Sequence, residues 1–152
     1  MLETPSKSVA RWVAAVLVAV LPTAACNVGE EAAKVSVNRI VGTWTARTGE
    51  TLIFSADRTL VSFGLDSEKL AETDCPGGRA EGTWAFFGNR SDGLYSTSEE
   101  AKSGSKIGLY YTRPFEETCW MDLMVVDGGE TLCATDDPDV PCSLDVRFTR
   151  RK

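Results

Sequence analysis

Short runs of apolar residues that alternate with polar ones occupy the chain from Ile40 to its C-terminus. In the last run, SLDVRFTR (143–150), the apolar residues are Leu144, Val146 and Phe148. Alternation of period two is typical of a strand with one buried face, and glycine, aspartate, asparagine and proline separate the runs as turn residues do. No run has the spacing of a long amphipathic helix. We therefore predict an all-β domain.

Nine segments of this domain are expected strands. They are the segment around Trp44, the two arms of ETLIFSADRTLVSF (50–63), and 80–87, 93–98, 106–113, 118–126, 130–135 and 143–150. The sequence Asp127-Gly128-Gly129 provides a tight turn before 130–135. A meander of this length has to protect its edge strands. We expect an antiparallel up-and-down meander of eight or nine strands that closes into a small barrel.

The segment ETLIFSADRTLVSF is the clearest hairpin in the chain. If Asp57 and Arg58 form a two-residue turn, four apolar side chains share one face of the two strands. The expected pairs across the hairpin are Phe54 with Val61 and Leu52 with Phe63.

The N-terminal segment has the order of an export signal. Lys7 and Arg11 precede an uncharged, mostly apolar run over 12–25, which is shorter than the about 20 residues of a membrane-spanning helix. Small residues then lead to Cys26. Basic residues, an apolar run and small residues in this order predict a signal peptide over 1–25 that is removed on export.

The stretch Thr23-Ala24-Ala25-Cys26 resembles the lipobox of bacterial lipoproteins, although leucine is usual where Thr23 stands. In that motif the cysteine is lipidated and becomes the first residue of the mature protein. The resemblance implies that a lipid on Cys26 holds the protein at the outer face of the cytoplasmic membrane; plain secretion is the alternative. Residues 26–38 would be a polar tether and 39–152 the barrel.

The cysteine count fits an exported protein. Four cysteines remain without Cys26, an even set that can pair completely in an oxidising compartment. Four cysteines allow three pairings, of which we favour the one that closes a short proline-containing loop. The favoured pairs are Cys133 with Cys142 and Cys75 with Cys119. The chain has no histidine and no C-x-x-C pair, so we expect no metal.

The charge of the chain argues against binding to nucleic acid. The net charge is −6, and the one basic cluster lies at the C-terminus, at Arg147, Arg150, Arg151 and Lys152. A protein that binds nucleic acid needs a broad basic surface, so we expect no nucleic-acid partner.

Catalytic motifs are equally scarce. Without histidine there is no Ser/His or Cys/His nucleophile, and no motif supports an unrecognised hydrolase that uses lysine or paired carboxylates. The pairs Glu99-Glu100 and Glu116-Glu117 are interpreted as solvated charge, and the acidic segment 136–139 lacks the spacing of an EF-hand. We expect no enzyme and no cofactor.

The tripeptide Gly42-Thr43-Trp44 recurs as GTW at 82–84, and we interpret both tryptophans as core residues. The first copy opens the domain, and an arginine-bearing strand closes it. This arrangement resembles the lipocalin and wider calycin pattern, in which a final-strand arginine covers the early tryptophan at the closed end of the barrel. The resemblance implies that Arg150 covers Trp44, with Arg147 as the second candidate.

A wider set of features resembles small lipocalin-like, calycin-like lipoproteins of actinobacteria, most of which have no assigned function. The set comprises the lipobox, VGTW, LIFSADRTL, a cysteine before the second GTW, and DPD ahead of the last strand. The resemblance covers nearly all of the mature chain. It departs at Arg58, where such hairpins often carry glycine.

Two functions follow as expectations. The resemblance implies a small apolar or amphipathic ligand inside the barrel, which requires an apolar cavity of about 300 Å³ or more. The alternative is a cell-envelope module with a filled barrel that recognises a protein or a wall polymer through exposed aromatic residues. The candidate aromatic residues are Tyr95, Tyr110, Tyr111 and Trp120.

Overall fold

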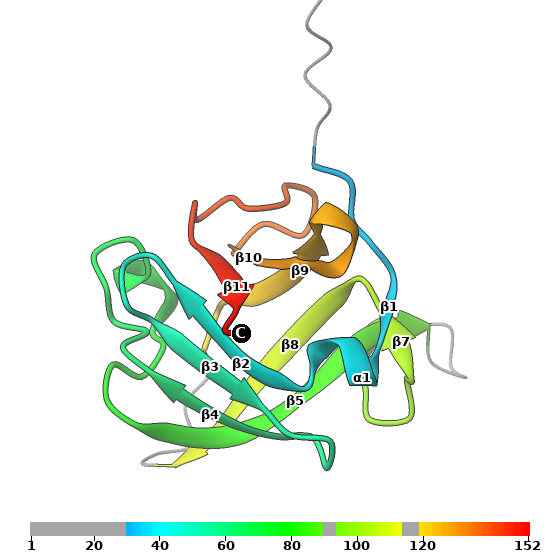
Figure 1. Cartoon of the computed structure of the whole chain (residues 1–152), viewed down its shortest axis with the longest axis horizontal. Helices are drawn as coiled ribbons and strands as arrows, with labels where there is room; N and C mark the ends of the chain where they lie inside the picture. The colour runs from blue at the N-terminus through cyan, green and yellow to red at the C-terminus, as the bar shows by residue number, and fades with distance from the viewer. Residues whose placement is uncertain (1–29, 90–93, 114–118) are drawn as a thin grey trace, which may run out of the picture.

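Eight antiparallel strands close into a barrel in the structure, a computed structural model that describes residues 30–89, 94–113 and 119–152 (Figure 1). The barrel strands are β2 (Gly42–Ala46), β3 (Thr51–Phe54), β4 (Thr59–Phe63), β5 (Ala80–Asn89), β8 (Lys106–Arg113), β9 (Asp122–Val126), β10 (Thr131–Thr135) and β11 (Arg147–Arg150). A ninth strand, β6 (Tyr95–Ser98), is added to β5. All nine expected segments contain a strand, and the all-β prediction is confirmed.

The barrel strands follow one another in chain order, so the predicted up-and-down meander is also confirmed. The ring closes where β11 pairs with β2, with Arg150 opposite Trp44. Strand β6 lies outside this ring. Phe86 of β5 pairs with Ile107 of β8 on one side and with Ser98 of β6 on the other. Strand β6 therefore lies on the same side of β5 as β4, beyond the end of β4.

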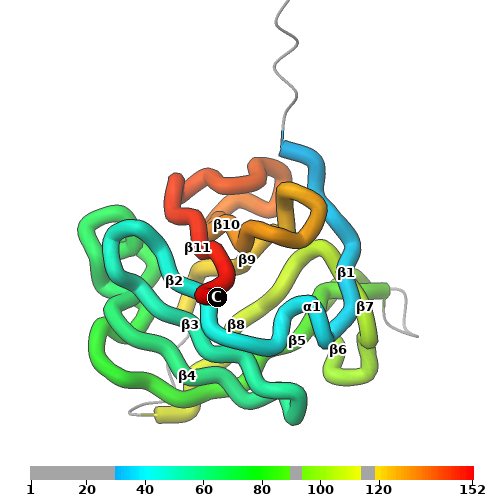
Figure 2. The backbone as a smooth tube through the Cα atoms, in the orientation of Figure 1, coloured from blue at the N-terminus to red at the C-terminus, as the bar shows by residue number. Residues whose placement is uncertain are grey.

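Residues 33–40, which we call the N-terminal strap, cross one end of the barrel (Figure 2). Within the strap, β1 (Val35–Ser36) pairs with β7 (Ser103–Gly104), and one helical turn, α1 (Val37–Ile40), leads into β2. The Ala33 amide donates to the Val125 carbonyl at 2.7 Å. Residues 26–38 were expected to form a polar tether, and the last six of them lie against the barrel.

The hairpin between β3 and β4 differs from the expected one by one residue. Its turn has three residues rather than two, and Arg58 takes the left-handed conformation with φ 71°. The Arg58 amide donates to the Ser55 carbonyl at 3.1 Å, which closes the turn. The longer turn shifts the register, so the pairing of Phe54 with Val61 and of Leu52 with Phe63 was wrong. Phe54 pairs with Leu60, Leu52 with Ser62 and Ile53 with Val61.

Large side chains fill the interior of the barrel. The largest that are fully buried are Trp44, Trp84, Phe54, Phe86, Phe148, Ile40, Leu52, Leu60, Leu65, Leu70, Ile107 and Met121. Trp84 lies at the centre of an aromatic group, with its ring edge-to-face with Phe54 at 5.4 Å and with Phe86 at 5.6 Å between centroids. A small eight-stranded barrel can hold either packed side chains or one small ligand, and here side chains occupy the interior.

Two disulfides secure the loops at the end of the barrel opposite the strap. Cys75 pairs with Cys119, joining the β4–β5 loop, which contains the helical turn η1 (Ala71–Thr73), to the segment before β9. Cys133 pairs with Cys142, which closes the β10–β11 loop. These are the pairings favoured from the sequence. At the strap end, η2 (Asp127–Gly129) forms the expected turn between β9 and β10. No helix in the described ranges is long and apolar enough to cross a membrane.

Candidate functional site

The residues of the calycin-like pattern come together at the closed end. The Arg150 guanidinium carbon lies 5.0 Å from the centroid of the Trp44 ring. Arg150 Nη1 donates to the Val41 carbonyl at 2.8 Å, and Nη2 donates to the Arg39 carbonyl. Gly42 leaves room for this guanidinium, since a Cβ there would lie 3.0 Å from Nη1. The group is a structural clamp that ties the last strand to the strap.

Arg147, the second candidate for this role, does not cover Trp44. Its side chain forms an ion pair with Glu30, outside the barrel. Alternate residues of a strand point to opposite faces. Arg150 therefore lies on the same face of β11 as the buried Phe148, whereas Arg147 lies on the outer face.

The second GTW copy has a similar clamp, which the sequence analysis missed. The Arg58 guanidinium carbon lies 4.4 Å from the Trp84 ring centroid and 5.6 Å from that of Phe86. Arg58 Nη2 donates to the Ala101 carbonyl at 2.5 Å, and Trp84 Nε1 donates to the Ser55 carbonyl at 3.2 Å. The repeat of GTW was the one sequence feature that related the two tryptophans, but it did not indicate Arg58.

Three aromatic side chains gather on the outer surface of β5, β6 and β8. We call Phe87, Tyr95 and Tyr110 the aromatic face. The rings of Phe87 and Tyr95 lie 5.7 Å apart, and the Tyr110 hydroxyl is hydrogen-bonded to the Thr97 hydroxyl at 2.5 Å. Tyr95 is 59% exposed and Tyr110 is 49% exposed. The face therefore offers ring surface to a partner.

Two neighbours hold the aromatic face in place. Gly108 lies beneath it, and a Cβ there would come within 2.6 Å of the Thr97 methyl group and 3.2 Å of the Phe87 ring. Lys106, which is almost fully buried, has its ammonium 4.4 Å from the Phe87 ring centroid and 2.7 Å from an Asp122 carboxylate oxygen. Gly108 and Lys106 thus pack against Phe87 and Thr97 at the base of the aromatic face.

The other aromatic candidates lie elsewhere. Tyr111 is buried, with 4% of its surface exposed, so its expected place among the exposed aromatics was wrong. It shares the inward face of β8 with Ile107 and Leu109. Trp120 is 65% exposed, but it lies at the disulfide end, where its amide donates to the Thr73 carbonyl.

A hollow of about 320 Å³ adjoins Tyr110 at the gap between β4 and β6. Its lining residues are Thr83, Trp84, Ala85, Thr97, Glu99 and Tyr110. Hydroxyl groups and one carboxylate thus surround an aromatic ring at the surface. The sequence could not reveal this group, because three separate strands and a turn contribute to it.

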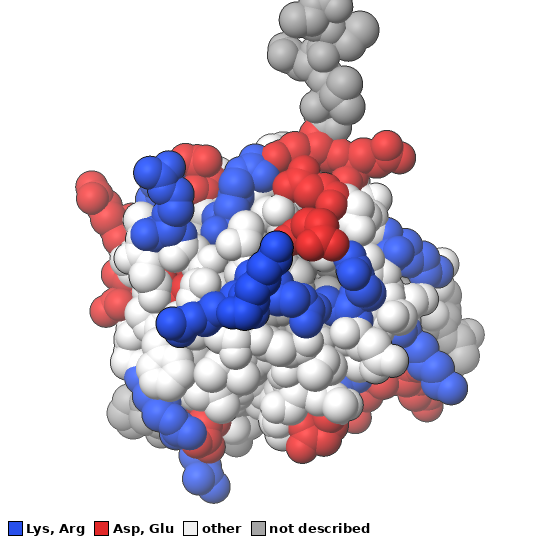
Figure 3. Space-filling view, viewed as in Figure 1, with Lys and Arg blue, Asp and Glu red and all other residues white. Residues whose placement is uncertain are grey.

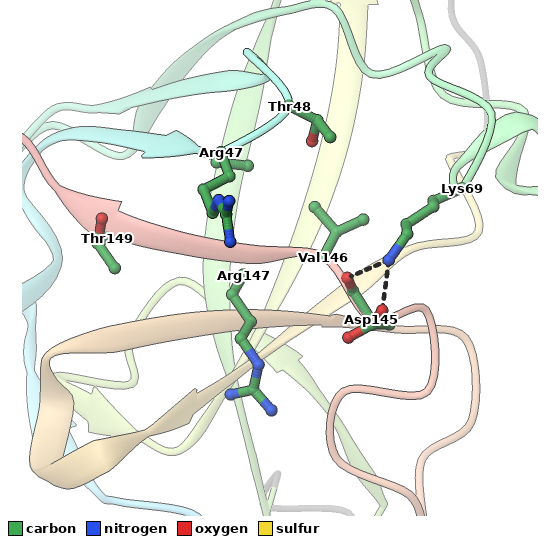
Figure 4. A pocket seen from close by; sticks show the side chains of 8 residues that line it. Arg47, Thr48, Lys69, Asp145, Val146, Arg147 and Thr149 are labelled. Carbon is green, nitrogen blue, oxygen red and sulfur yellow. Dashed lines mark hydrogen bonds and ion pairs between the residues drawn. The ribbon is translucent and has the colours of Figure 1, made fainter.

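A second hollow, of about 660 Å³, lies outside β11 (Figure 4). The residues that line it are Ala46, Arg47, Thr48, Lys69, Asp145, Val146, Arg147 and Thr149. Lys69 forms an ion pair with Asp145 and also donates to its carbonyl at 3.1 Å. The Lys69 hydrogen bond and charge hold the pKa of the Asp145 carboxyl below its ordinary value. We call this site the basic hollow.

None of the family models, curated proteins or solved structures compared with this chain matches it. The function has to be inferred from the geometry of the described residues.

A buried carboxylate lies near the basic hollow. Glu50 is 2% exposed, and the Thr48 hydroxyl donates to its Oε2. Burial by itself would raise the pKa of the Glu50 carboxyl. Hydrogen bonds from neighbouring hydroxyl groups and the charge of Lys69 outweigh burial, so the pKa is lowered. This burial could not be predicted from the sequence, because Glu50 follows a glycine in an ordinary polar turn.

The acidic candidates that the structure describes make local hydrogen bonds. In the acidic loop, Asp137 accepts from the Asp139 amide at 2.9 Å and Asp136 accepts from the Ser143 hydroxyl at 2.6 Å. Within the described ranges, one group of possible metal ligands is close enough together, Glu30 with Cys133 and Cys142, and its cysteines are already joined in a disulfide. Cys26 and the pair Glu116-Glu117 lie outside the described residues.

Proposed function

We propose that this protein is an exported, lipid-anchored module of the cell envelope that binds a wall glycan with the outer surface of its barrel. The observation that carries the proposal is the combination of the aromatic face with the hollow beside Tyr110. The interior of the barrel is occupied by its own side chains, which favours an outer site.

The chemistry of this hollow suits a sugar. A sugar ring has a C–H face that packs on an aromatic ring and a rim of hydroxyl groups that need hydrogen-bond partners. Tyr110 supplies a half-exposed ring, and Thr83, Thr97 and Glu99 supply hydroxyl and carboxylate partners around it. A few polar groups placed around an apolar surface are what orients a small-molecule group in a binding site.

The start of the described chain and the proposed site lie on opposite sides of the barrel. Glu30, at the start of the described chain, pairs with Arg147 of β11. Strand β5 is the fourth strand from β11 in either direction around the ring of eight. An anchored barrel would thus present β5 away from the membrane, toward the polymer outside it.

The tether between anchor and barrel is short. The backbone of Ala33 is already hydrogen-bonded to the barrel, and an extended chain spans about 3.5 Å per residue. The segment from Cys26 to Ala33 therefore reaches about 25 Å at most. The two disulfides fit the oxidising compartment that such an anchor requires.

The alternative, a small apolar ligand inside the barrel, is supported less. Such a ligand would have to displace residues that are fully buried, among them Trp84, Phe54 and Phe86. Removing an aromatic side chain from its place in a core costs about 3–5 kcal/mol.

Sedimentation with insoluble cell-wall glycan tests the proposal. Wild-type protein should be retained, Tyr110→Ala and Glu99→Gln should be retained at least about ten-fold less, and Tyr110→Phe should bind nearly as wild type because it keeps the ring. Trp120→Ala is the matched control, since it removes an even more exposed aromatic residue at the other end of the barrel.

Three outcomes would overturn the proposal. One is equal retention of wild type, Tyr110→Ala and Glu99→Gln. Another is an equal loss in Trp120→Ala. The third is binding that survives enzymatic digestion of the glycan and disappears after protease treatment of the wall preparation, which would assign the aromatic face to a protein partner instead.

A further inference from the structure

We infer that the basic hollow is a second binding site, for a small oxyanion such as a phosphate or carboxylate group. It lies on β2 and β11, on the other side of the barrel from the aromatic face. The inference is independent of the proposed glycan site, because no residue lines both hollows.

The charge of the basic hollow is opposite to that of the molecule. The chain carries a net charge of −6, yet Arg47, Lys69 and Arg147 line the hollow with Asp145 as the one acidic residue. Basic side chains also gather beside it, around the C-terminal end of β11, while acidic ones surround the start of the described chain (Figure 3). An anion approaching this otherwise acidic protein would be attracted to this face.

Arg47 is the side chain best placed to bind the anion. It extends from the β2–β3 turn over β11 toward the hollow, as Figure 4 shows. Among the described residues it has neither an ion-pair nor a hydrogen-bond partner, whereas Lys69 and Arg147 are each paired with a carboxylate. A guanidinium group donates two parallel hydrogen bonds to the oxygens of a phosphate or carboxylate.

The other lining residues complete the site. Val146 and Ala46 are nearly fully buried and form an apolar floor, and the exposed Thr149 brings a hydroxyl group to the rim. Lys69 is held at the rim by Asp145, so it adds positive charge there while the Asp145 carboxylate opposes an incoming anion. A volume of about 660 Å³ admits an organic group attached to the anion.

The test is a titration of the purified exported protein with sodium phosphate at constant ionic strength, followed by the amide resonances of Thr48 and Val146. Wild type should show a saturable shift. Arg47→Gln should weaken binding about ten-fold, as expected for the loss of a charge-assisted pair of hydrogen bonds.

A second variant changes affinity in the opposite direction. Asp145→Asn removes the opposing charge and should tighten binding several-fold. Asparagine tolerates the left-handed conformation that Asp145 adopts, with φ 52°, so the turn is kept. Arg113→Gln, an exposed arginine of β8 outside the hollow, is the control and should bind phosphate as wild type does.

Equal shifts with phosphate and with chloride at the same ionic strength would overturn the inference. So would unchanged affinity in Arg47→Gln, or weaker binding in Asp145→Asn. Vesicles of phosphatidylglycerol and of phosphatidylcholine then identify the source of the anion. Vesicle binding that free phosphate displaces and Arg47→Gln abolishes assigns the site to a lipid headgroup, and phosphate binding without vesicle binding assigns it to a soluble ligand.

Discussion

At the scale of single residues, two arginines secure two tryptophans by the same means. Arg150 covers Trp44 and binds the carbonyl groups of Arg39 in the strap and of Val41 directly after it, whereas Arg58 covers Trp84 and binds the Ala101 carbonyl. Each guanidinium thus joins a ring in the core to backbone carbonyl groups of another part of the chain. A cation over an aromatic ring contributes about 0.5–2 kcal/mol, and more when water is excluded.

A double-mutant cycle tests the first clamp. Trp44→Ala should lower the free energy of unfolding by about 3–5 kcal/mol, and Arg150→Ala should lower it by less. Most of the effect of Arg150→Ala should vanish when Trp44 is already absent, because the two side chains are in contact. Urea unfolding of the four proteins measures the coupling, and additive losses would show that the clamp does not contribute.

The second clamp can be tested by whether one substitution, Arg58→Gly, raises or lowers the stability of the protein. Glycine adopts positive φ freely, so Arg58→Gly in a plain turn should stabilise the protein by about 0.5–1 kcal/mol. Because Arg58 also covers Trp84 and binds Ala101, we expect Arg58→Gly to destabilise it instead, by about 1–2 kcal/mol. A raised melting temperature in Arg58→Gly would contradict this role.

Glu50 should make stability depend on pH. Its pKa is lower in the folded protein than the ordinary value of 4.5, so the unfolded chain binds the proton more tightly. The stabilising effect is present above about pH 4.5 and is lost as the pH falls through the lower folded pKa. In urea unfolding between pH 3 and 6, the free energy of unfolding should fall less steeply with decreasing pH in Glu50→Gln than in wild type. An equal pH dependence in the two proteins would contradict the prediction.

At the scale of elements, periodicity predicted the strands but not the register of the first hairpin. Alternation depends only on which face of a strand is buried, so it located all nine segments. The register depended on the left-handed backbone of Arg58, which the sequence does not mark because an arginine seldom adopts this conformation.

Contacts between segments that are distant in the chain could not be predicted from the sequence. The strap pairs two residues with two others far along the chain, which is too short a match to give a pattern. Tyr110 and Tyr111 could both be proposed from the sequence as exposed aromatic residues. The structure was needed to show which of the two points outward from β8. The basic hollow joins Arg47, Lys69 and Asp145 from three separate loops, so no local motif marks it.

The two disulfides should differ in their contributions. Cys75 and Cys119 are 44 residues apart and Cys133 and Cys142 are 9 apart, so the first closes the longer loop. Each should stabilise the protein by roughly 2–4 kcal/mol, and the first by about 1 kcal/mol more than the second. Thermal unfolding of the two paired cysteine-to-serine variants checks this order, and a larger loss for the shorter loop would reverse it.

At the scale of the whole molecule, the proposed binding surfaces lie on different sides of the barrel. The strap and the two clamps close one end, the disulfides secure the loops of the other, and side chains fill the space between. The aromatic face on β5, β6 and β8 lies across the ring from β11, beside which the described chain begins. Recognition by the outer surface of a filled barrel is the central claim.

Mapping the resonances that shift when soluble wall-glycan fragments are added tests this claim most directly. The account predicts that the shifts centre on Thr83, Thr97 and Tyr110 at the outer surface, while the core signals of Trp44 and Leu52 stay in place. Shifts centred on Trp44, Leu52 and the other core residues would contradict it, because they would mean that the interior opens to take the ligand.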